Sequence, residues 1–100
     1  MAAAGLIQEW LRRLDQQQVD DWMSGKLSVT EKVAKLLHGH PMLARMYKPV
    51  ILQQVEGISG EEVYRRLTRD RPDLNLGDKD KAVARISEDL QEVRKLIQAL

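Results

Sequence analysis

The sequence has no cysteine, and its unbroken apolar runs are short, Val50 to Leu52 being one of them. Without cysteine there is no disulfide framework, no thiolate metal site and no cysteine nucleophile. Runs this short cannot cross a bilayer, which takes about 20 apolar residues. The N-terminus lacks the apolar segment of a signal peptide. We therefore expect a cytoplasmic protein with no membrane partner.

A large excess of one charge is also missing, because 16 Lys and Arg face 15 Asp and Glu, for a formal net charge of +1. The first 50 residues hold seven basic and five acidic side chains, and the last 50 hold nine and ten. No half is a basic arm, and the strong basic excess typical of nucleic-acid binding is absent. An argument for DNA binding must rest on how the cations are distributed.

The composition is that of a folded domain, with 43% apolar and 31% charged residues. One hundred residues support a single domain, residues 1–100, with one modest core. Apolar residues recur every three or four positions, and no alternating run is long enough for a strand. The sequence predicts an all-α fold, a compact bundle of about five helices with a helix-turn-helix-like core and a long C-terminal helix.

The first helical segment is stopped by Ser24 and Gly25. Before that point the helix either ends near the glutamines at 16–18 or continues through Trp22. Trp10 and Trp22 fall at apolar positions, which favours core or interface anchors over a base-stacking platform. The apolar face of this segment comprises Leu6, Ile7, Trp10, Leu11 and Leu14.

Capping residues and prolines set the bounds of the second and third helices. Ser28 and Glu31 form a capping box that starts the second. Pro41 suits the first turn of the third, which Gly57 ends. Pro49 predicts either a kink in that helix or two short helices. The inward faces are predicted at Val29, Val33, Leu36 and Leu37, and at Leu43, Met46, Tyr47, Val50, Ile51 and Val55.

The fourth predicted helix starts at a second capping box, Ser59 with Glu62. It ends near Arg71, because Pro72 disfavours helical geometry in the residue before it. The loop that follows carries two leucines that we expect to point inward. Asp78 then offers its carboxylate to the free amides of the last helix.

The last helix carries a heptad seam, with apolar residues at 83, 86, 90, 93, 97 and 100. Such a seam pairs with a second copy or a partner helix, or it belongs to the core. Charged replacements of Leu90 and Val93 distinguish these cases, since they leave a folded monomer in the first and unfold the protein in the second. The candidate interface residues are Val83, Ile86, Leu90, Val93 and Ile97.

No group of side chains indicates catalysis. His38 and His40 lie in an interhelical turn with no third ligand, which favours helix-end capping over a metal site. Carboxylates such as Asp89 stand beside basic residues, as on a solvated helical face. The glycines are scattered rather than clustered into a phosphate loop. We expect no enzyme activity, no metal, no cofactor and no small-molecule substrate.

The densest basic cluster starts in the fourth helix and continues after the loop. Three arginines there lie within one helical turn of each other, a spacing that can hold a phosphate backbone. Four aspartates are interleaved with the cations and weaken phosphate affinity, so a solvated face is the alternative interpretation. The candidate DNA-binding residues are Arg65, Arg66, Arg69, Lys79, Lys81 and Arg85.

Residues 59–67 read Ser-Gly-Glu-Glu-Val-Tyr-Arg-Arg-Leu, and residues 72–76 read Pro-Asp-Leu-Asn-Leu. These motifs resemble a helix and the following turn of winged-helix regulators of the ferric uptake regulator family, and the resemblance covers residues 49–100. It implies a helix-turn-helix whose last helix, opening at Asp78, enters the major groove of double-stranded DNA.

The resemblance stops at the recognition helix. Residues 78–81 read Asp-Lys-Asp-Lys where the family has Thr-Val-Tyr-Arg, and no wing hairpin follows. The metal-binding histidines and cysteines of the family have no counterparts, so metal sensing is not implied. Residues from His40 to Leu67 also resemble the helical N-terminal segment of some insertion-sequence transposases, a DNA-associated module without catalytic residues.

Two functional hypotheses follow. The first is a small helix-turn-helix protein that binds double-stranded DNA as a homodimer, as a transcriptional regulator or mobile-element accessory factor. The alternative is a helical protein-interaction module without DNA binding, such as a dimerisation domain, an adaptor or a phage-derived inhibitor. The alternative fits the near-zero net charge and the missing wing better.

Overall fold

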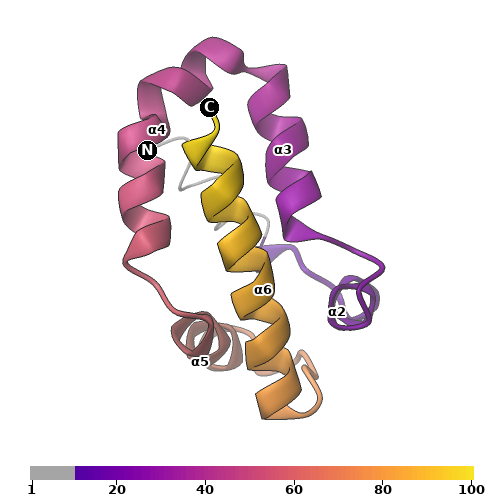
Figure 1. Cartoon of the computed structure of the whole chain (residues 1–100). Helices are drawn as coiled ribbons and strands as arrows, with labels where there is room; N and C mark the ends of the chain where they lie inside the picture. The colour runs from indigo at the N-terminus through magenta and orange to yellow at the C-terminus, as the bar shows by residue number, and fades with distance from the viewer. Residues whose placement is uncertain (1–10) are drawn as a thin grey trace.

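The computed structural model describes residues 11–100, and its long C-terminal helix α6 (Lys79–Gln98) runs through the middle of the molecule (Figure 1). The helices α3 (Val29–Gly39) and α4 (Pro41–Glu56) flank its C-terminal half. The helices α2 (Gln16–Met23) and α5 (Gly60–Asp70) lie across its N-terminal half. The described residues contain no strand, so the prediction of an all-α fold with a long last helix is confirmed.

The predicted N-cap residues set the starts of three helices, although the side chains of Glu31 and Glu62 do not return the second bond of the two predicted capping boxes. Ser28, Ser59 and Asp78 each accept a hydrogen bond from the backbone N–H three residues later, at 3.3, 3.1 and 3.0 Å. Each bond satisfies an amide that has no partner inside its own helix. Pro41 occupies the first turn of α4, where a missing N–H costs nothing.

The structure decides two points that the sequence left open, the start of α2 and the continuity of α4 at Pro49. The helical segment is interrupted at Asp15, which is the N-cap of α2. Its carboxylate accepts from the N–H of Gln18 at 2.8 Å, and the Gln18 side chain accepts from the N–H of Asp15 at 3.1 Å. The glutamines therefore start α2 instead of ending an earlier helix. Pro49 lies inside a single α4, whose ribbon bends in Figure 1. Leu6, Ile7 and Trp10 lie outside the described residues.

The core consists of two clusters joined along α6. The cluster at the N-terminal half of α6 comprises Leu14, Val19, Trp22, Leu67, Leu76, Ala82 and Ile86. The cluster at its C-terminal half comprises Ile51, Val55, Val93 and Ile97. Leu90 packs against both. Among the described helices, α2 to α5 therefore all pack against α6.

Candidate interaction surfaces

The helix α5 approaches α6 closely at Gly60. A Cβ atom at this position would overlap with Oγ of Ser87 and would lie only 3.0 Å from the carbonyl oxygen of Val83. Glycine is thus the residue that lets the two backbones come together. The approach fixes the cations of α5 relative to the first turn of α6, as a helix-turn-helix would require.

The loop from Arg71 to Asp78 is held by contacts with the chain around residue 12. Nη1 of Arg71 donates to the carbonyl oxygen of Arg12 at 2.6 Å. The Gln16 side chain both donates to the carbonyl of Asn75 and accepts from its N–H, each at 2.8 Å. Leu76 is buried, as the sequence predicts for this loop. These hydrogen bonds fix the loop that leads into α6, and so they also fix the position of the first turn of α6.

Five of the six predicted DNA-binding residues are exposed at this end of the molecule: Arg65, Arg66, Arg69, Lys79 and Lys81. Carboxylates lie beside three of them, in the pairs Arg66–Glu62 at 2.8 Å, Arg69–Asp70 at 2.9 Å and Lys79–Glu61 at 3.8 Å. The hydrogen bond from Arg69 lowers the pKa of the Asp70 carboxyl, which keeps this carboxylate ionised. The positive charge of the surface is locally offset.

Arg85, the sixth predicted DNA-binding residue, turns toward the α2–α3 connection. Its Nε donates to the carbonyl of Trp22 at 2.8 Å, and its Nη2 donates to that of Leu27 at 3.0 Å. Nη2 also lies 3.5 Å from the carboxylate of Asp89. Since its donors are occupied within the fold, we do not assign Arg85 to a DNA contact.

Asp89 is a buried polar centre, with only 4% of its surface exposed, and not part of a solvated face. Its carboxylate accepts from Nε1 of Trp22 at 2.6 Å, from the N–H of Val29 at 3.2 Å and from Oγ1 of Thr30 at 3.1 Å. A side chain of α6 thus caps the N-terminus of α3. The sequence indicates this burial by spacing, because Asp89 lies three residues after Ile86 and four before Val93, on the buried side of α6.

The predicted interface seam lies largely inside the molecule. Ile86, Val93 and Ile97 are buried, because α2 to α5 cover this side of α6. Val83 and Leu90 are partly buried. Of the two roles that the sequence left open, the core role accounts for the three buried residues, so we do not keep them as an interface with a second chain.

A different apolar surface is exposed on α3 and α4, and we call it the hairpin surface. Met42 is 79% exposed and Met46 68%, whereas the other three members are between 42% and 48% exposed. This finding corrects the inward orientation predicted for four of its residues, since the core contacts of α4 come from Ala44, Ile51 and Val55. The hairpin surface comprises Leu36, Met42, Leu43, Met46 and Val50.

The charged residues within the segment that carries the hairpin surface, residues 32–55, have one sign, with Glu31 directly before it. From Lys32 to Val55 the chain contains no Asp or Glu. Lys32, Lys35 and Arg45 are exposed and form no ion pair among residues 11–100. Lys48 instead donates to the carbonyls of Gln98 and Leu100 and caps the end of α6. Sequence reasoning missed this surface because it tracked cations by density rather than by the absence of carboxylates.

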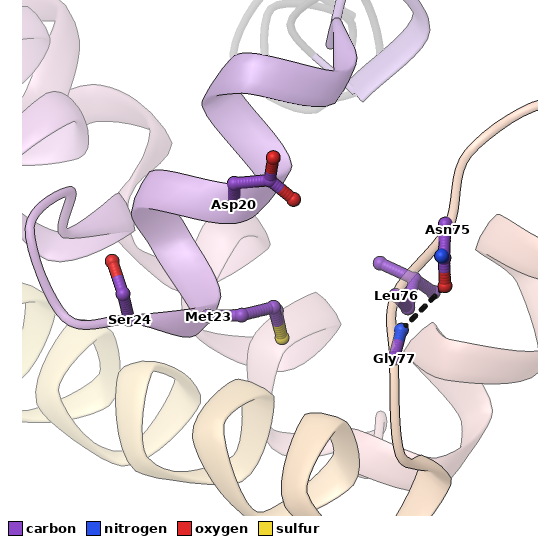
Figure 2. A pocket seen from close by; sticks show the side chains of 6 residues that line it. All are labelled: Asp20, Met23, Ser24, Asn75, Leu76 and Gly77. Carbon is purple, nitrogen blue, oxygen red and sulfur yellow. Dashed lines mark hydrogen bonds between the residues drawn. The ribbon is translucent and has the colours of Figure 1, made fainter.

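A shallow hollow lies between the end of α2 and the loop before α6 (Figure 2). Within it, Oδ1 of Asn75 accepts from the N–H of Gly77 at 2.9 Å, and the carboxylate of Asp20 accepts from the Gln16 amide at 2.9 Å. These polar groups already have partners, and no nucleophile with an adjacent base is among them. The hollow is lined by Asp20, Met23, Ser24, Asn75, Leu76 and Gly77.

The part of the chain that the structure describes holds no group of three or more metal-ligating side chains. His38 and His40 are both exposed at the turn between α3 and α4. Within the same residues, no helix has the combination of length and apolar character that a bilayer crossing requires.

The comparisons found no match to this chain among family models, curated proteins or solved structures.

Proposed function

We propose that this chain is a helical protein-interaction module that binds a partner protein through the hairpin surface and performs no chemistry of its own. The observation that supports this proposal is the exposure of Met42 and Met46, which contribute little to the core. Clustered apolar side chains on a monomer surface mark interaction sites. Methionine adapts its shape to a partner, and its thioether is polarizable.

The energetics favour covering this surface. Burying a Met, Leu or Val side chain is worth about 1.5 to 3 kcal/mol relative to full exposure. The two methionines are mostly exposed, and the other three residues are nearly half exposed. A partner that covers all five gains enough apolar burial to offset part of the entropy lost on association.

The test is site-specific photocrosslinking in cells of the source organism. A photoreactive residue at Met46 should give a discrete adduct, while the same residue at Gln91, an exposed position on α6, should not. Adding Leu43→Glu to the first variant should abolish the adduct, because it places a charge in the contact. Equal labelling at positions 46 and 91, or an adduct that survives Leu43→Glu, would refute the proposal.

DNA binding by the α5–α6 end is a second candidate function. It is supported by the five exposed cations and by the ordered, open first turn of α6. Against it stands the charge balance of residues 60–81. Six Lys and Arg are matched there by six Asp and Glu: residues 65, 66, 69, 71, 79 and 81 against 61, 62, 70, 73, 78 and 80.

An electrophoretic shift with random duplex across a salt series tests this candidate. Binding should fall steeply with salt, and Arg66→Ala with Lys81→Ala should weaken it several-fold. Lys35→Ala, on the hairpin, is the matched control and should leave it unchanged. No shift at low ionic strength removes DNA from the candidates.

A further inference from the structure

The four α4 residues of the hairpin surface lie on one side of the helix, away from its core side. At 100° per residue, Met42, Leu43, Met46 and Val50 fall within an arc of about 100°. The buried residues Ala44, Ile51 and Val55 fall on the opposite side. The α4 helix is therefore apolar on two sides, and the fold uses only one of them.

The relief and the charge of the hairpin surface suit a helix. Two mostly exposed methionines and three aliphatic side chains that are nearly half exposed offer the kind of apolar residues against which the side chains of a helix pack. On α3, Lys32 lies one turn before Leu36, and Lys35 is its neighbour. Lys32 and Lys35 therefore border Leu36, and Arg45 directly precedes Met46 in α4, so cations accompany the apolar side chains, as in surfaces that recognise acidic segments.

A second copy of the chain is a poor occupant on electrostatic grounds. An isologous dimer would set the same surface against itself. Lys32, Lys35 and Arg45 would then face their own counterparts, with no carboxylate between Lys32 and Val55 to compensate. Like charges brought together across an interface oppose association.

A bilayer is also a poorer fit than a helix. Surfaces that dip into the headgroup region typically carry Trp or Phe on their apolar side. The hairpin surface has neither, and the nearest aromatic residue of α4, Tyr47, packs against the core instead.

We infer that the partner segment is an acidic amphipathic helix of another protein. Its apolar residues, three and four positions apart, cover Met42, Leu43, Met46 and Val50, and its Asp and Glu side chains face Lys32, Lys35 and Arg45. This inference rests on the proposed function and adds the chemistry of the partner to it.

The probe is a synthetic amphipathic peptide of about 18 residues, with leucines at helical spacing and glutamates on both flanks. Its matched counterpart carries lysines in place of the glutamates. Titrated against the full-length protein by calorimetry, the acidic peptide should bind at least about tenfold more tightly than the basic one. Its affinity should fall as salt is raised, since exposed charges are screened.

Variants locate the contact. Met46→Glu should abolish binding of the acidic peptide, and the double variant Lys32→Gln with Lys35→Gln should weaken it several-fold while leaving the circular dichroism spectrum unchanged. Gln91→Glu is the matched control, because it adds the same charge at an exposed site on α6. It should change the affinity by less than about twofold.

Four outcomes overturn the inference. Equal binding of the two peptides shows that the surface takes proteins but that acidity does not select them, which leaves the proposed function intact. Binding to phosphatidylglycerol vesicles without binding to either peptide refutes both. A dimer that Met46→Glu dissociates makes a second copy the occupant. No binding to either peptide at about millimolar concentration removes the acidic helix as partner.

Discussion

The two halves of α6 have different surroundings. Along the N-terminal half and at the middle of α6, polar side chains reach across the fold to backbone groups, as Arg85 does to the carbonyls of Trp22 and Leu27 and Asp89 does to the N–H of Val29. Along the C-terminal half, Arg94 likewise donates to the carbonyls of Val55 and Ile58, but α3 contributes no buried residue and α4 exposes two methionines. Both halves tie polar side chains to the backbone, and they differ in the surrounding helices: those around the C-terminal half leave apolar side chains exposed and leave Lys32, Lys35 and Arg45 without an ion pair among residues 11–100.

This difference distinguishes side chains that stabilise the fold from side chains that are available to bind another molecule. A charged side chain that already bonds to carbonyls, amides or carboxylates of the same chain holds the fold together and has few free hydrogen-bonding groups for a ligand. Charge and apolar surface without internal partners are available to another molecule. The dense arginines of α5, which attract attention in the sequence, belong mainly to the first kind, whereas the sparse lysines of α3 belong to the second.

Asp89→Ala should have the largest effect on stability. It removes the acceptor for the Val29 N–H, for Nε1 of Trp22 and for a hydroxyl of α3, and it leaves the partly buried guanidinium of Arg85 without its carboxylate. Breaking a buried pair in this way costs about 3 to 5 kcal/mol of unfolding free energy. Urea denaturation followed by circular dichroism measures it.

The matched control is Glu88→Ala, one residue earlier. Glu88 is exposed and lies 3.9 Å from Arg85, so its loss should cost less than about 0.5 kcal/mol. If both variants lose the same stability, Asp89 is not the buried polar centre that its hydrogen bonds indicate.

Gly60→Ala should have an intermediate effect. The added Cβ meets Ser87 and the Val83 carbonyl, so α5 must shift away from α6, at a cost of about 1 to 3 kcal/mol. Ser87→Gly in the same chain should recover part of the loss, because it removes two of the three close contacts. Gly39→Ala, where a Cβ meets nothing within 4 Å, should be neutral or slightly stabilising by urea denaturation. Equal losses at positions 60 and 39 would contradict the close approach.

The fold was predictable where its causes are local. The caps at Ser28, Ser59 and Asp78 act over three residues, and the period of α6 is visible in its own sequence. The carboxylate of Asp89 could not be assigned in the same way, because its partners lie about 60 residues away in the chain.

The candidate site was not predictable for a related reason. The apolar residues of α4 recur on more than one side of the helix, so periodicity indicates that the helix is apolar without saying which side is covered. Leu43 and Met46 are exposed because α6 and α3 contact the side that carries Ala44 and Ile51. Only the tertiary arrangement distinguishes a core stripe from a binding stripe on such a helix.

Asp73→Asn should have a small, pH-dependent effect. The hydrogen bond from Arg71 lowers the pKa of the Asp73 carboxyl in the folded protein. A lowered carboxyl pKa stabilises the fold above the ordinary value near 4, and this contribution is lost as the pH falls through the lowered value. Melting temperatures of the variant and the parent should differ slightly at neutral pH and converge in acid, once the pH is below the lowered pKa of Asp73. A difference that persists in acid would assign the effect to packing.

Met46→Glu should have no measurable effect on stability. Its side chain is mostly exposed, so a carboxylate there stays hydrated and the unfolding free energy should change by less than about 0.5 kcal/mol. Ala44→Glu, two residues earlier on the same helix, places a charge at a position that is only 3% exposed and should unfold the protein. If urea denaturation finds Met46→Glu as damaging as Ala44→Glu, the hairpin surface is core and its exposure cannot explain a binding function.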